Sequence, residues 1–192
     1  MHFIKKWVMP SNHQDSSRNS KRLFHVSEEP GIELFEPRPS PSFFTEITGN
    51  VVFAIGDRLL HNYLLPRDCP RVTYYQTANT TTADKEKFFG ESGAEFVVIV
   101  ESGWYERIKN TTIYCYELPA NDFTLLDECA AYYVSYHPAI PINIRTIPDV
   151  IAELINRNVE LRLTPSLKKI ADEVSKSSLN FSIIRMRNAA GG

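Results

Sequence analysis

The apolar residues of this chain fall into short runs, and the length of those runs limits the folds open to it. The longest run is Phe96–Val100, which has the length of a buried strand and is far too short to cross a bilayer as a helix. We therefore expect six to eight short strands and no membrane-spanning segment. The other strand-like runs occupy residues 23–26, 50–55, 72–75, 112–118, 132–135 and 159–163.

Helical patterns are fewer than strand patterns. Residues 148–156 and 164–176 place apolar side chains at helical spacing, and both ranges begin at or next to a proline. The range 57–65 starts with an aspartate that suits the N-cap of a short helix, and residues 104–108 suit a single turn. The polar range 76–86 is expected to be a loop. Because strands and helices do not alternate regularly, we expect an α+β fold with mainly antiparallel mixed sheets and three or four short helices.

Composition and length fit an ordinary globular protein. The chain has 192 residues, of which 43% are hydrophobic and 23% are charged. Residues 1–21 end in a polar run without periodicity, so we expect a flexible leader followed by a single α+β domain over residues 22–192. Lys and Arg gather at the two ends, whereas the middle of the chain is acidic. An acidic centre does not favour nucleic acid as a partner, although the basic ends leave it open.

Cysteines and histidines indicate the compartment and the absence of a metal site. Three cysteines are too few for a disulfide framework, and no secretory signal is visible, so we expect a cytoplasmic protein. The five histidines lack the spacing of metal ligands, so we expect no metal. Cys69 lies in the run Pro-Arg-Asp-Cys-Pro-Arg, residues 66–71. It is either a thiol whose pKa the arginines lower or part of a rigid turn, and we favour the turn.

Arginines in loops are candidates for binding an anion. Arg38, Arg67 and Arg71 lie in segments that prolines stiffen, where a guanidinium suits bidentate binding of phosphate. The alternative is an ion pair with one of the nearby acids. Arg185 and Arg187 lie two apart in an expected strand and so share a face, which makes either an anion patch or a solvated edge.

His25 is the polar residue that most suggests a function. It lies inside the apolar run Leu23-Phe24-His25-Val26, and strand alternation places it on the same face as Ser27. An imidazole beside a hydroxyl can hold an amide or a ribose hydroxyl, because both ring nitrogens form hydrogen bonds. The alternative is a core histidine bonded to a backbone carbonyl. The sequence leaves both interpretations open.

Most of the chain resembles an uncharacterised bacterial family of conserved hypothetical proteins. The residues that carry this resemblance are Arg22-Leu23-Phe24-His25-Val26-Ser27-Glu28-Glu29-Pro30-Gly31 and the positions up to Arg38, together with residues 63–72 and 181–188. The resemblance covers residues 22–188 and implies no activity.

A second resemblance is to ADP-ribosyltransferase-like domains, including RNA 2′-phosphotransferases. It rests on the order of three short segments: the His25 strand, the strand Val51-Val52-Phe53-Ala54, and Tyr132–Ser135 leading into Ile140-Pro141. The resemblance implies a split sheet and NAD as the cofactor, with His25 gripping the nicotinamide ribose.

We expect a small-molecule nucleotide, or a substrate that carries one, as the partner, and no membrane. The expected cofactor-binding residues are His25, Ser27, Arg38, Phe53 and Tyr133. Either Tyr133 or its neighbour Tyr132 stacks on a flat ring, or both pack in the core.

The late strand departs from the transferase pattern. Residues 130–135 contain no glutamate where the catalytic acid is expected, and the nearest acids are Asp127 and Glu128. Without a carboxylate, the ribosyl cation and the attacking group lose their main electrostatic and general-base support. We therefore take His25 and Glu128 as the candidate catalytic pair of a nucleotide-binding protein whose transferase activity is altered. The alternative is a non-enzymatic interaction module on the same fold.

Overall fold

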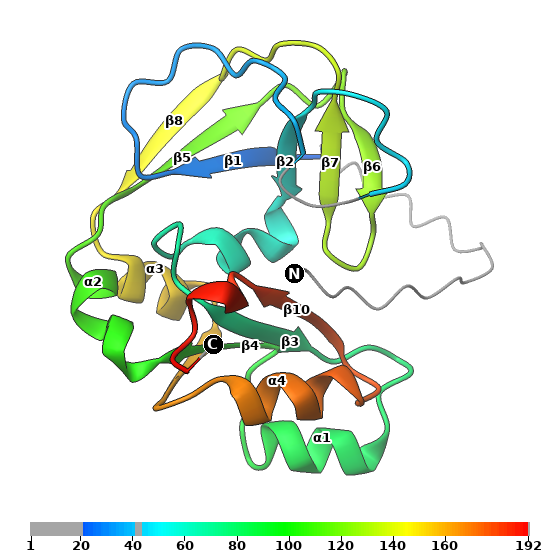
Figure 1. The fold of residues 1–192 in the computed structure, drawn as a ribbon, viewed down its shortest axis with the longest axis vertical. Helices are drawn as coiled ribbons and strands as arrows, with labels where there is room; N and C mark the ends of the chain where they lie inside the picture. Colours follow the sequence, from blue (N-terminus) through cyan, green and yellow to red (C-terminus); the bar gives the residue numbers. More distant parts are fainter. Residues whose placement is uncertain (1–20, 41–43, 192) are drawn as a thin grey trace.

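The structure of the protein, a computed structural model, describes residues 21–40 and 44–191. These residues form two β-sheets, one above the other in Figure 1. The larger is a six-stranded sheet in which every pairing is antiparallel. Its strands, in spatial order, are β6 (Thr124–Asp127), β7 (Tyr132–Ser135), β2 (Val52–Gly56), β1 (Leu23–Ser27), β5 (Ile113–Leu118) and β8 (Asn143–Ile147).

The smaller, four-stranded sheet is mixed. Its spatial order is β10 (Asn180–Ile184), β3 (Arg71–Tyr75), β4 (Phe96–Glu101) and β9 (Val159–Thr164). β9 runs parallel to β4, whereas the other two pairings are antiparallel. All side chains of β3 and β4 are buried. Burial on both faces explains why Phe96–Val100 is a continuous apolar run rather than an alternating one.

The helices of the described chain are short, and none is long and apolar enough to cross a membrane. In Figure 1, α1 and α4 lie on the side of the four-stranded sheet that faces away from the other sheet. The α-helices are α1 (Thr82–Phe89), α2 (Tyr105–Lys109), α3 (Val150–Asn156) and α4 (Lys168–Ser175), and the 3-10 helices are η1 (Asp57–Tyr63), η2 (Ser102–Trp104) and η3 (Met186–Asn188).

Three clusters of buried side chains hold these layers together. The largest joins the facing sides of the two sheets, with Ile55 and Cys115 from one sheet and Val98 and Val100 from the other. A second cluster lies between the four-stranded sheet and the helices α1 and α4. The third lies on the outer face of the six-stranded sheet, where Phe35 covers it. The protein is thus a layered α+β structure.

The predicted α+β class with mainly antiparallel mixed sheets is confirmed. Two predictions about helices were wrong. The range 76–86 contains the start of α1, which Thr81 caps by accepting a hydrogen bond from the Asp84 N–H. The sequence did not predict this helix, because it is mostly polar and only Phe88 and Phe89 of its residues are buried. Asp57 is the first residue of η1 rather than its cap.

The predicted leader lies outside the described residues, except for Lys21. The Lys21 ammonium donates a hydrogen bond to the carbonyl of Phe123 at 3.1 Å. It also lies 3.9 Å from the centre of the Tyr133 ring. Lys21 is therefore attached to the six-stranded sheet.

Candidate functional site at the split between β1 and β2

The six-stranded sheet splits between its two central strands. β1 pairs with β2 at only two positions, Leu23↔Gly56 and Phe24↔Ile55. On its other edge, β1 pairs with β5 along all of Leu23–Ser27. Figure 1 shows β1 running steeply across the direction of β2. The second half of β1 therefore pairs with β5 alone. Its other edge pairs with no strand of the described residues, so side chains can approach it.

His25 lies at the first position of this split. Its Nδ1 is 2.9 Å from the carbonyl oxygen of Phe53. A carbonyl only accepts, so Nδ1 carries the proton, and Nε2 of the neutral ring is an acceptor. The ring also contacts Phe35, with 4.6 Å between the ring centres. In the part of the chain that the structure describes, Nε2 has no hydrogen-bond partner.

The surroundings of His25 keep the ring neutral. Burial lowers the pKa of His25, and the positive charges of Arg67 and Arg38 lower it further, whereas the bond to Phe53 opposes the shift. The charges that act on the ring are thus cationic. At neutral pH, His25 presents an uncharged acceptor, Nε2, in a positively charged environment.

Ser27 and Arg38 lie on either side of the split. The Ser27 hydroxyl accepts a hydrogen bond from the Glu29 N–H at 3.0 Å, so its own proton is free to be donated. Arg38 exchanges two backbone hydrogen bonds with Val51, at 3.0 and 2.9 Å. This bridge fixes Arg38 at the start of β2, and its side chain is exposed.

Phe53 contributes its carbonyl rather than its ring. The ring packs with Phe44 and Tyr132, with ring centres 6.1 and 6.2 Å apart. Tyr132 is buried, and burial raises the pKa of its phenol. These aromatic side chains belong to the core between the sheets, which agrees with the packing alternative for Tyr132.

Two of the predicted site residues have no direct contact with His25 in the described part of the chain. Tyr133 is paired with Ala54 on β2 and lies under the Lys21 ammonium. Glu128 is exposed in the turn between β6 and β7. Burial raises the pKa values of Tyr133 and Cys129, and the Glu128 charge adds to this shift, for Cys129 together with Asp127. No hydrogen bond, ring contact or ion pair of the described residues joins Glu128 or Tyr133 to His25. The structure thus brings together His25, Ser27, Arg38 and the Phe53 carbonyl.

Cys69 lacks the properties of a reactive thiol. It is fully buried, and burial raises its pKa to about 12 although the Arg71 charge acts in the other direction. Its N–H donates to the Pro66 carbonyl at 2.9 Å, as expected for a tight turn. The turn interpretation is the one that agrees with these contacts.

The arginines predicted for anion binding have three different environments. Arg71 is buried and donates to the carbonyls of Asn62 and Cys69 at 2.8 and 2.9 Å, so it forms neither a phosphate site nor an ion pair. Arg67 is exposed at the tip of the same turn. The expectation that Arg185 and Arg187 share a strand face was wrong, because Arg185 caps η3 with a φ of 56°.

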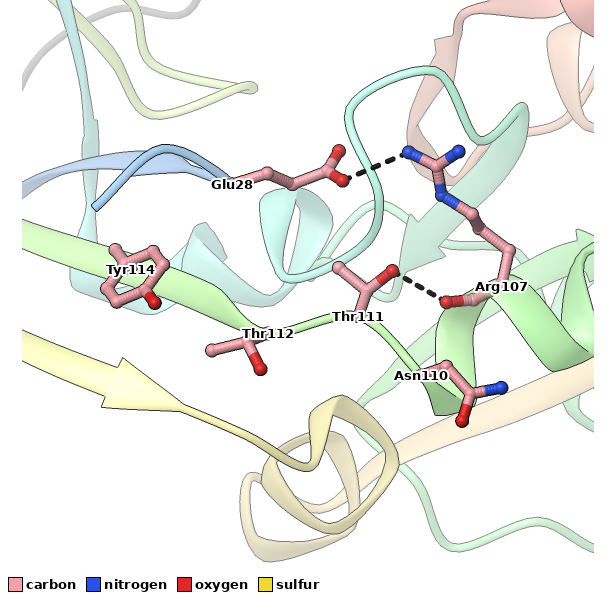
Figure 2. A pocket seen from close by; sticks show the side chains of 6 residues that line it. All are labelled: Glu28, Arg107, Asn110, Thr111, Thr112 and Tyr114. Carbon is pink, nitrogen blue, oxygen red and sulfur yellow. Dashed lines mark hydrogen bonds and ion pairs between the residues drawn. The ribbon is translucent and has the colours of Figure 1, made fainter.

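A shallow hollow of about 430 Å³ lies beside the end of β1 (Figure 2). The Arg107 guanidinium donates to Glu28 at 3.1 Å, and the Thr111 hydroxyl donates to the Arg107 carbonyl at 2.6 Å. The second Glu28 oxygen accepts from the Arg67 N–H at 2.7 Å, so this carboxylate is used for structure. No sequence pattern pointed to this hollow. Its lining is Glu28, Arg107, Asn110, Thr111, Thr112 and Tyr114.

A second hollow, of about 560 Å³, lies at the start of β9 and is lined by residues 92–95 and 158–160. Neither hollow is lined by His25. Within residues 21–40 and 44–191, no three His, Cys, Asp or Glu side chains gather in a way that suits a metal ion.

The fold and the site define an α+β protein with a split antiparallel sheet and a neutral histidine at the split. The chain belongs to a family of unknown function, DUF6886, whose model matches residues 24–189. This match confirms the resemblance to an uncharacterised family, and the resemblance to ADP-ribosyltransferase-like domains is not part of it. Searches of curated proteins and of solved structures found no match.

Proposed function

We propose that the protein binds a nucleotide at the split between β1 and β2, with NAD as the expected ligand. The observation that carries the proposal is the His25 ring, whose Nδ1–H is held by the Phe53 carbonyl while Nε2 is left as an acceptor. An unused acceptor on a fixed, neutral ring suits a ribose hydroxyl, which donates one hydrogen bond and accepts others.

The neighbouring groups supply what a nucleotide further needs. Ser27 lies two residues along the same strand and has a hydroxyl proton to donate. Arg38 and Arg67 supply positive charge for the phosphates. A dinucleotide such as NAD carries ribose hydroxyls and a diphosphate, so these residues fit its polar groups.

The same residues do not fit an efficient transfer reaction. Cleavage of the bond between nicotinamide and ribose develops positive charge on the sugar, which a carboxylate stabilises. The charges that act on His25 are those of Arg67 and Arg38. Both are positive, whereas the stabilising carboxylate would be negative. We therefore propose binding with little or no group transfer, and Glu128 stays the candidate acid for any residual activity.

Calorimetric titration of the full chain with NAD tests the proposal. We expect binding that His25→Ala abolishes, with His137→Ala as the control because His137 is an exposed histidine with no direct contact to His25 among the described residues. Glu128→Gln is expected to preserve binding. Equal affinity of the wild type and His25→Ala would contradict the proposed site, and no heat at millimolar NAD would contradict nucleotide binding.

The alternative function, an interaction module, is favoured by one observation. β8 is an edge strand. Ile142, just before it, is 65% exposed, and Ile144, within it, is 48% exposed. An unpaired edge with exposed apolar side chains can accept a strand from another copy of the chain. Sedimentation analysis decides: the alternative requires a dimer that Ile144→Lys converts to monomer, whereas a wild-type monomer rules out this self-pairing.

A further inference from the structure

Most arginines of the described chain form ion pairs with carboxylates, and two of the exceptions, Arg67 and Arg185, are in direct contact. The Arg71 guanidinium donates its hydrogen bonds to buried backbone carbonyls. Four arginines, Arg38, Arg67, Arg185 and Arg187, have no carboxylate within 4.0 Å among the described residues. Six others form ion pairs with carboxylates: Arg22, Arg58, Arg107, Arg145, Arg157 and Arg162.

Direct contacts link two of the unneutralised arginines to the end of β1. The Arg67 N–H donates to a Glu28 carboxylate oxygen at 2.7 Å. The Arg67 carbonyl in turn accepts from Nε of Arg185 at 3.3 Å. The Asn188 side chain donates to the Asp68 carbonyl at 2.7 Å, which ties η3 to the same turn (Figure 1). Arg67 and Arg185 are therefore neighbours although they lie far apart in the sequence.

This arrangement is held rigidly. The buried Arg71 guanidinium bonds the carbonyls of Asn62 and Cys69, which fixes the turn that carries Arg67. Arg185 has a φ of 56°, a left-handed conformation that is uncommon for a residue with a side chain. Such conformations persist where the surrounding structure enforces them, and they gather at functional sites.

The positive charges repel one another. Burial lowers the pKa of Arg185, and the charges of Arg187 and Arg67 lower it further, while Asp68 opposes them. Arg67 and Arg38 act in the same direction on His25. Nε of Arg185 is used by the Arg67 carbonyl, which leaves its two terminal nitrogens for another acceptor. A bound anion would relieve this repulsion.

We infer that Arg67, Arg185 and Arg187 form a binding site for a phosphate-bearing ligand. The inference rests on the proposed function and deepens it, since it names the diphosphate of the ligand as the group that these arginines bind. A diphosphate carries more charge than a carboxylate and has oxygens for several guanidinium forks at once.

Inorganic pyrophosphate is the probe, because it lacks the nucleoside that the His25 site would bind. Calorimetry at constant ionic strength is expected to show binding to the wild type, and affinity at least tenfold weaker for Arg185→Gln and Arg67→Gln. Arg58→Gln is the matched control, since Arg58 and its partner Glu95 are both more than half exposed and the pair lies elsewhere. Its affinity is expected to stay within twofold of the wild type.

Two further variants keep the test sharp. Arg185→Lys retains the charge without the fork and is expected to bind with intermediate affinity. Arg187→Gln alters an exposed side chain, so it reports on binding even where Arg185→Gln fails to fold. Binding of pyrophosphate that none of the arginine variants weakens would overturn the inference, as would no binding at millimolar pyrophosphate.

Nicotinamide riboside, which has no phosphate, separates this inference from the proposed function. If the riboside binds in a His25-dependent manner and pyrophosphate does not bind, the phosphate site is wrong and the nucleotide site stands. If pyrophosphate binds through the arginines and neither NAD nor the riboside depends on His25, the phosphate site stands and the proposed function fails.

Discussion

The Nδ1 nitrogen of His25 lies 2.9 Å from the carbonyl oxygen of Phe53, at the point where β1 parts from β2. The His25 side chain thus donates to the Phe53 carbonyl, in place of the backbone N–H that would come next in the β1–β2 ladder. Each of the two interpretations of His25 from the sequence agrees with one part of the structure. The ring is bonded to a backbone carbonyl, as in a core histidine. Its second nitrogen has no hydrogen-bond partner among residues 21–40 and 44–191, as a ligand-binding residue requires.

The bond from His25 to Phe53 predicts a measurable loss of stability. His25→Ala removes the donor and leaves the Phe53 carbonyl without its partner, which is expected to cost roughly 1–2 kcal/mol. Urea unfolding monitored by circular dichroism measures this cost. His25→Asn, whose amide can still donate, is expected to lose less, and an unchanged midpoint in His25→Ala would show that the bond contributes nothing.

The buried Arg71 predicts a larger effect. Arg71→Met keeps much of the volume but leaves the carbonyls of Asn62 and Cys69 without donors, so we expect a loss of roughly 2–3 kcal/mol in the free energy of unfolding. Arg71→Lys, which keeps the charge and fewer donors, is expected to lie between the two. Greater stability of Arg71→Met than of the wild type would mean that the desolvation cost outweighs these bonds.

His61 predicts a dependence of stability on pH. The side chain is buried, and burial, with the charges of Arg157 and Arg58, lowers its pKa to about 3. The unfolded chain therefore binds a proton at His61 below about pH 6.5, while the folded chain does not. This contribution to stability is complete above about pH 6.5 and is lost as the pH falls toward 3.

Urea unfolding at pH 7 and pH 5 measures the His61 effect. The wild type is expected to lose about 2 kcal/mol more between these pH values than His61→Gln, which cannot titrate. Equal losses in the two proteins would show that the pKa of His61 is ordinary in the folded state.

The cysteines are expected to react in a fixed order. Cys69 and Cys115 are buried, and burial raises their pKa values to about 12 and about 11. Cys129 is partly exposed. A thiol reagent applied to the native protein is therefore expected to label Cys129 first and the other two only on unfolding. Mass spectrometry of the labelled peptides reads this order, and rapid labelling of Cys69 would restore the reactive-cysteine interpretation.

The sequence predicted the strands better than the site. Apolar runs such as residues 96–100 marked strands, because burial on both faces requires continuous apolar residues. β6 was missed, since its residues are exposed or half-buried and show no apolar run. His25 and Ser27 were proposed from alternation within one strand, and both lie on β1. The contact between Arg67 and Arg185 joins a turn to a left-handed residue more than a hundred positions away. A local sequence pattern cannot predict such a contact.

The most direct test of the account is the state of the His25 ring nitrogens, read by long-range ¹H–¹⁵N NMR of the imidazole. At pH 7 we predict a neutral ring with the proton on Nδ1 and an unprotonated Nε2. Addition of NAD is predicted to shift the Nε2 resonance while the exposed His137 ring stays unchanged. A proton on Nε2, a charged ring, or an Nε2 resonance unmoved at millimolar NAD would contradict the role of His25 as the acceptor of a nucleotide site.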